Sequence, residues 1–149
     1  MPTANTQTLA PSRCPVAFLS TIISLDQKAP TTASGKTLKI RALQNQGGTG
    51  REAMEIGFTD IPTGAYGCQL ELYLPAGTAI TNAGSSQINT YLLNSDISTQ
   101  DTWMKAPTKG NLFGTTNVYS NPKQPTTIVI RSLECKNLNL RFEIASPTE

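Results

Sequence analysis

The sequence predicts an all-β fold, a two-sheet antiparallel β-sandwich of jelly-roll-like form with about eight strands. Short runs in which apolar and polar residues alternate recur along the chain, as in strands that bury one face. Clusters of Gly, Pro, Asn and Ser separate these runs, which is typical of the turns in a sandwich. No run keeps the i, i+3, i+4 apolar spacing of a helix over several turns.

The elements follow one another in a single domain. Residues 1–14 are rich in Thr, Pro and Ala without apolar periodicity, so we expect an extended N-terminal arm before a sandwich over residues 15–149. The expected strands cover residues 16–25, 37–43, 52–59, 68–74, 86–93, 112–119, 126–132 and 138–144. In the runs that alternate most strictly, such as 138–144, we expect one buried and one solvated face.

The loops and the first apolar run bear on function and location. The longest loops are expected at residues 80–85 and 94–110, and loops at one end of a sandwich are a common place for a binding site. Residues 15–25 resemble the apolar core of a signal peptide, but hydroxyl residues interrupt them, so a buried strand is the better interpretation. No apolar run reaches the length of about 18 residues that spans a bilayer, and no membrane association is expected.

The composition excludes several classes of function. The chain has no histidine, which excludes Ser-His-Asp and Cys-His nucleophile systems and zinc sites that depend on imidazole. Its 12 basic residues are scattered, without the basic stripe that nucleic-acid binding requires. We expect a protein that is not an enzyme, has no cofactor and does not bind nucleic acid.

Three cysteines bear on the compartment. Cys68 and Cys135 each lie beside a predicted strand, and no histidine is present to activate either thiol, which favours a disulfide over a reactive cysteine. A disulfide indicates an oxidising compartment, so we expect a secreted protein, with a cell wall as one candidate location. Cys14 lies in the predicted arm and is either free or paired between chains.

Three aromatic residues are candidates for ligand binding. Trp103 lies in the long loop, four residues before Pro107, and it either packs against Pro107 as a structural plug or stacks on a sugar ring. Packing is the favoured interpretation. Tyr91 lies near a turn, and Tyr73 is out of phase with the leucines on either side of it, which places it on the exposed face of its strand.

Two pairs of carboxylates lie close in sequence, Glu52 with Glu55 and Asp96 with Asp101. A glycosidase needs two carboxylates that face one bond, and a calcium site needs several oxygen ligands. Because no ligand-dense motif occurs, we expect all four to be solvated surface charges and no metal to bind. Asp96 and Asp101 remain candidates for ligand binding because they lie in the long loop.

From Ile56 onward the order of landmarks resembles that of one family. The residues that carry the resemblance are 58–62, 67–75 with Cys68, 86–91, Thr102-Trp103 with Pro107, Gly114-Thr115, Cys135 and Phe142-Glu143. They are similar to the C-terminal domain family of the fungal ubiquitin-like-modifier-binding protein. That resemblance implies a secreted β-sandwich without known catalysis. The element around Trp103 is also similar to one in polysaccharide-binding sandwich modules.

Three hypotheses on function follow. The first is a non-catalytic secreted β-sandwich protein that binds cell-wall or host polysaccharide. The second is a secreted structural or effector protein that acts through a protein partner, using a sheet face or an edge strand. The third is an enzyme that uses carboxylates alone, which requires two close carboxylates with a raised pKa in one cleft.

Overall fold

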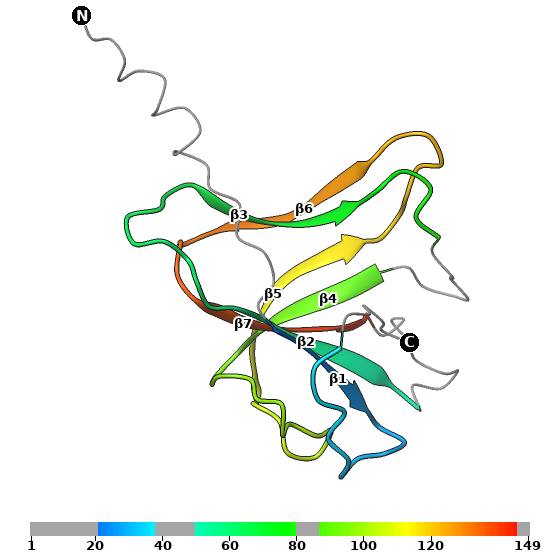
Figure 1. Cartoon of the computed structure of the whole chain (residues 1–149), viewed down its shortest axis with the longest axis vertical. Helices are drawn as coiled ribbons and strands as arrows, with labels where there is room; N and C mark the ends of the chain where they lie inside the picture. Colours follow the sequence, from blue (N-terminus) through cyan, green and yellow to red (C-terminus); the bar gives the residue numbers. More distant parts are fainter. Residues whose placement is uncertain (1–20, 38–49, 80–86, 146–149) are drawn as a thin grey trace, which may run out of the picture.

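The computed structural model describes residues 21–37, 50–79 and 87–145, and it confirms the predicted antiparallel β-sandwich. This part of the chain contains no helix, and so none that could cross a membrane. Its strands are β1 (Thr21–Asp26), β2 (Glu52–Phe58), β3 (Cys68–Leu74), β4 (Gln87–Leu93), β5 (Lys109–Asn117), β6 (Thr126–Leu133) and β7 (Leu138–Ile144). They form a five-stranded sheet in the order β1-β2-β7-β4-β5 and a two-stranded sheet of β3 and β6, which lies over it (Figure 1).

The strand boundaries agree closely with the alternation in the sequence. The predicted runs 68–74 and 138–144 coincide with β3 and β7, while β5 begins at Lys109 rather than at Leu112. Of the predicted run 37–43 only Thr37 lies within the described residues, where its N–H donates to the carbonyl of Ile22 at 2.9 Å. The predicted arm 1–14, with Cys14, lies outside the described residues.

The core lies between the two sheets and is built from the two central strands. Met54 of β2 is the register partner of Phe142 of β7, and Ile56 pairs with Leu140. All four side chains are buried, and Leu70 of β3 packs with them from the opposite sheet. Burial of apolar surface on this scale is the main favourable contribution to folding.

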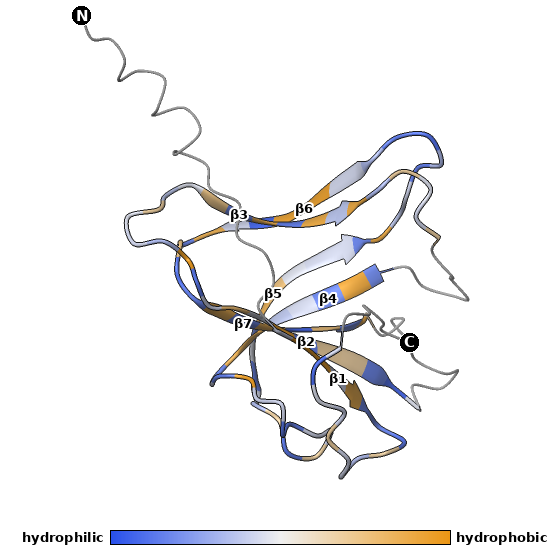
Figure 2. Ribbon diagram, in the orientation of Figure 1, coloured by the Kyte–Doolittle hydropathy of each residue, from blue (hydrophilic) through white to orange (hydrophobic). Residues whose placement is uncertain are grey.

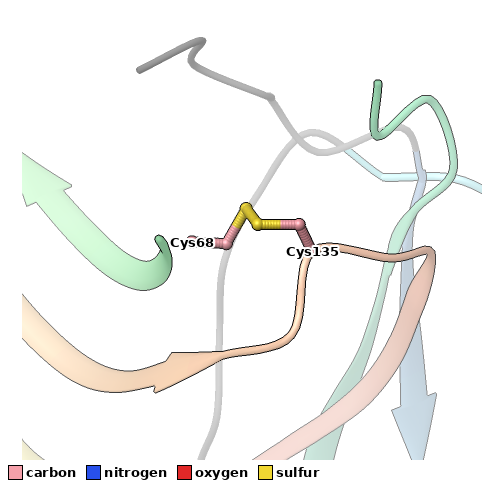
Figure 3. Close-up of a disulfide and its surroundings, with 2 residues drawn as sticks. All are labelled: Cys68 and Cys135. Carbon is pink, nitrogen blue, oxygen red and sulfur yellow. A yellow bond between two sulfur atoms is a disulfide. The ribbon is translucent and has the colours of Figure 1, made fainter. Parts of the chain in front are cut away.

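A disulfide joins the two-stranded sheet to the start of β7. Cys68 begins β3, and Cys135 lies in the connection from β6 to β7, with Cα atoms 5.3 Å apart (Figure 3). The bond was predicted and is confirmed. Because it spans 67 residues of sequence, the entropy of loop closure gives about 4 kcal/mol of stabilisation.

The outer face of the five-stranded sheet differs from the prediction. We expected a solvated face on β7, but Arg141 and Glu143, which point away from the core, are buried as well. In contrast, β3 has exposed side chains at every second position, as predicted, and both β3 and β6 carry mixed hydrophobic and hydrophilic colours (Figure 2). Something other than the second sheet must therefore cover the outer face of β2 and β7.

Candidate functional site

The cover is the segment 94–108, which connects β4 to β5 and crosses the outer face of the five-stranded sheet. A Cβ atom on Gly57 of β2 would lie 3.1 Å from the Cδ1 atom of Ile97. The Ile97 side chain therefore packs over β2. The side chain of Asn139 in β7 accepts a hydrogen bond from the Ile97 N–H at 3.3 Å and donates to Asp96 at 3.0 Å. Figure 1 shows this segment, in yellow-green, on the side of the sheet away from β3 and β6.

Two local turns shape the segment. In the first, the Ser98 hydroxyl accepts from the Gln100 N–H, and the Asp101 carboxylate accepts from the Ser98 N–H at 2.8 Å. This reciprocal arrangement resembles a capping box. In the second, the backbones of Thr102 and Lys105 exchange two hydrogen bonds, which leaves Trp103 and its neighbour at the tip. The turns thus fix the positions of the Asp101 and Trp103 side chains.

Under this segment the carboxyl of Glu55 meets the carboxylate of Asp101. Glu55 is fully buried, and within the described residues neither of its oxygens has a hydrogen-bond partner by distance and angle. Burial first and then the nearby Asp101 raise the pKa of Glu55, which comes to about 8 against the opposing effect of Arg141. At neutral pH Glu55 is therefore mostly protonated, and its hydroxyl can turn toward Asp101.

Beside this pair, three cations surround one buried carboxylate. Glu143 of β7 lies 2.8 Å from the Lys109 ammonium and 3.4 Å from Nη2 of Arg51 through the same oxygen. Its other oxygen accepts from Nε of Arg141 at 3.1 Å. A buried carboxylate in this position is stabilised by several charge-assisted contacts.

Two of these cations also cover aromatic rings. The Arg141 guanidinium lies 4.9 Å from the centroid of the Trp103 ring, and the Lys109 ammonium lies 4.4 Å from that of Tyr91. Trp103 is only partly buried. Each ring therefore has one face occupied by a cation, which is a favourable contact of about 1 kcal/mol at a partly exposed site.

The structure brings together four of the five predicted binding residues. Trp103, Tyr91, Asp101 and Asp96 all lie at the outer face of the five-stranded sheet, on β4 or on the segment 94–108. Tyr73 does not belong to this group, because it lies on β3 of the other sheet.

The predicted solvation of the carboxylates is wrong for two of them. Glu55 and Asp101 are buried, because the segment 94–108 closes over the sheet. Arg51, Lys109 and Glu143 form one cluster that was not predicted from the sequence. The alternation of β7 gave the faces of the strand correctly, but nothing local in the sequence indicates that a distant loop covers one of them.

The pair of Glu55 and Asp101 meets only part of what a carboxylate enzyme requires. Glu55 and Asp101 satisfy one requirement of a carboxylate enzyme, since they are close and one pKa is raised. They do not satisfy the other, because the Glu55 oxygens have no access to solvent. In the described part of the chain, no three His, Cys, Asp or Glu side chains gather as a metal site.

A second surface is formed by the outward side chains of the two-stranded sheet, Gln69, Glu71, Tyr73, Thr127 and Val129, which we call the β3–β6 face. Tyr73 is 62% exposed and Val129 is 51% exposed. The register pairs Tyr73 with Thr127 and Glu71 with Val129, so the two apolar groups are diagonal neighbours. Gln69 donates to Glu71 at 2.8 Å and supplies a polar edge.

Residues 19–147 match the family described as "Ubiquitin 3 binding protein But2 C-terminal domain". The match covers both sheets, the disulfide and the segment 94–108. No curated protein and no solved structure matches the chain.

Proposed function

This chain belongs to the But2 C-terminal domain family, and we propose on that basis that it is a non-catalytic domain that binds a protein partner of the ubiquitin kind. The family description names a ubiquitin-binding protein, which supports a protein ligand. The observation that carries the proposal is the β3–β6 face. An exposed tyrosine beside an exposed valine, with polar groups around them, has the composition of a small interface centre with a polar rim.

The proposed interface extends toward the end of β3. The segment after β3 is tied to the segment after β5, since Gly77 N–H donates to the Asn121 carbonyl at 2.9 Å and the Ser120 hydroxyl donates to the Thr78 carbonyl at 2.7 Å. Tyr119, which is 57% exposed, lies next to these contacts. An exposed tyrosine beside this connection offers further surface that a partner can bury.

Polysaccharide binding at the long loop receives less support. Sugar rings often stack on an open aromatic face, and Trp103 and Tyr91 each have one of their two faces occupied by a cation. Tyr73 is free of such a contact among the described residues, but it is a single ring without a second aromatic on its own sheet face. We therefore place the protein partner first and polysaccharide second.

The compartment is a separate proposal. The Cys68–Cys135 disulfide supports a secreted or cell-surface location, because such bonds persist in oxidising surroundings. A ubiquitin-like partner inside a cell would meet the reduced protein instead. The binding test is therefore made with both the oxidised and the reduced domain, and immunodetection of the protein in culture medium and in cell extract tests the location itself.

The experiment is a titration of the 15N-labelled domain with unlabelled ubiquitin, followed by NMR. We expect chemical-shift changes confined to the backbone amide signals of β3, β6 and their connecting loops. Shifts that map instead to the segment 94–108, or no shifts in either redox state, would contradict the proposal. A parallel titration with soluble polysaccharide fragments tests the second hypothesis on the same sample.

A further inference from the structure

A shallow depression of about 300 Å³ lies where the end of β4, the start of β5 and the start of β7 meet. Its size falls at the lower end of the range for small-molecule sites. Its lining includes Leu93, Asn94, Asn111, Lys136, Asn137 and Leu138. None of these residues belongs to the β3–β6 face, so this surface is distinct from the proposed protein interface.

The wall formed by β5 depends on a bulge and a glycine. Leu93 pairs with Lys109 and Tyr91 pairs with Leu112, so a single residue of β4 faces two residues of β5, Gly110 and Asn111. A bulge of this kind changes the direction of a side chain and is frequent near functional sites. A Cβ atom on Gly110 would lie 2.8 Å from Oδ1 of Asn94, and its absence keeps that part of the depression open.

The opposite wall is held by the disulfide. Lys136 and Asn137 directly follow Cys135, whose bond to Cys68 fixes the connection between β6 and β7 (Figure 3). Leu138 is buried at the start of β7. A wall that is already fixed loses little conformational entropy when a ligand binds.

Within the described residues, some polar side chains of the depression make hydrogen bonds to the protein and others do not. Asn94 donates to the Thr108 hydroxyl at 2.9 Å, so its amide is partly committed. Asn111 and Asn137 are exposed, and neither side-chain amide has a protein hydrogen-bond partner within the described residues. Each of these two amides offers both an acceptor oxygen and a donor NH2 group.

We propose that this depression is a binding site for a carbohydrate, with Asn111 and Asn137 hydrogen-bonding adjacent hydroxyl groups of a sugar. A hydroxyl group both donates and accepts, so it can pair with either end of an amide. Leu93, which is partly exposed, provides apolar surface for the C–H groups of the ring, in the usual combination of apolar lining with a few polar groups. Lys136, which pairs with the exposed Glu134 at 3.1 Å, adds a positive charge at the rim.

The test is an NMR titration of the oxidised domain with three probes, the pentasaccharides of cellulose, laminarin and chitin. Each probe is added up to about 10 mM, a concentration that detects dissociation constants near 1 mM. We expect at least one probe to shift the side-chain amide signals of Asn111 and Asn137. The variant Asn111→Ala/Asn137→Ala should bind that probe about thirtyfold more weakly, which corresponds to about 2 kcal/mol for two lost hydrogen bonds. The matched control is Asn117→Ala, an exposed asparagine at the far end of β5, which should bind as the unmodified domain does.

Three results would overturn the proposal. The first is the absence of shifts with all three probes. The second is an equal shift of the same signals by glycerol at the same concentration of hydroxyl groups, which shows a solvent effect. The third is equal binding by the double variant and the control. Both variants change exposed side chains, and thermal unfolding verifies that they fold.

Discussion

The guanidinium of Arg141 lies over the indole of Trp103, with its central carbon 4.9 Å from the ring centroid. Arg141 belongs to a central strand, whereas Trp103 sits at the tip of a turn in the segment 94–108. The contact therefore joins the loop to the sheet. One face of the ring thus lies against a side chain of the sheet, and the packing of Trp103 against Pro107 stays a prediction.

We predict that Trp103→Ala destabilises the protein by about 2 kcal/mol. Truncation of a fully buried tryptophan costs about 3–5 kcal/mol, and Trp103 is only partly buried. Urea unfolding followed by circular dichroism measures the change. The control is Met104→Ala, which removes a side chain that is 69% exposed on the same turn and should alter stability by less than about 0.5 kcal/mol. Equal stability of the two variants would show that the indole does not anchor the segment.

We predict that stability falls as the pH rises from about 4.5 to about 8, because of Glu55. The pKa of this carboxyl is raised from 4.5 to about 8 in the folded protein, so between these values the folded state holds a proton that the unfolded state has released. The stabilising effect of that proton is complete below pH 4.5 and is lost as the pH passes through 8. Each pKa unit corresponds to about 1.4 kcal/mol, which gives roughly 5 kcal/mol as an upper value.

The variant Glu55→Gln tests this assignment. Glutamine keeps the shape of the protonated acid and carries no ionisable group, so this slope of stability with pH should disappear. Melting temperatures at half-unit intervals of pH, followed by the fluorescence of the single tryptophan, give the comparison. An unchanged slope in the variant would assign the pH dependence to another group.

We predict that Glu143→Gln costs about 3 kcal/mol. Removal of the carboxylate leaves Arg141, Lys109 and Arg51 without their shared counter-charge, and breaking a buried ion pair from one side is costly. The matched control is Glu134→Gln, since Glu134 pairs with Lys136 on the surface and such pairs contribute little. If both variants unfold at the same urea concentration, the cluster around Glu143 does not hold the sheet and the segment together.

We predict that oxidatively folded protein yields a linked pair of peptides that contain Cys68 and Cys135. Mass spectrometry of a digest without reductant detects the pair. The variant Cys68→Ala/Cys135→Ala should lose about 4 kcal/mol of stability, since the unfolded chain regains the entropy of a long open loop. Recovery of both cysteines as alkylated thiols from the unmodified protein would contradict the structure at this point.

The strands were predictable because their information is local. Alternation at 68–74 and 138–144 sufficed to give β3 and β7 with their correct faces, and the exposed position of Tyr73 followed from it. The cysteine pair was predictable because the fold class and the lack of histidine left few alternatives.

The cluster under the segment 94–108 was not predictable in the same way. Glu55 and Asp101 are 46 positions apart by their sequence numbers, and their contact depends on the path of a long irregular loop. A charged residue on the outer face of a strand, such as Glu55, or in a loop, such as Asp101, is normally solvated, so the sequence favoured the wrong environment for both. The charge pattern alone does not distinguish a solvated face from one that a loop covers.

The affinity of the domain for ubiquitin, measured by isothermal titration calorimetry for three proteins, tests the proposed function most directly. The unmodified domain and Met104→Ala should bind equally, because Met104 is exposed on the opposite side of the five-stranded sheet. Tyr73→Ala should bind at least about tenfold more weakly, as truncation of an interface tyrosine commonly costs more than 1.4 kcal/mol. Equal affinity of Tyr73→Ala and the unmodified domain, or no binding by any of the three, would contradict a protein interface on the β3–β6 face.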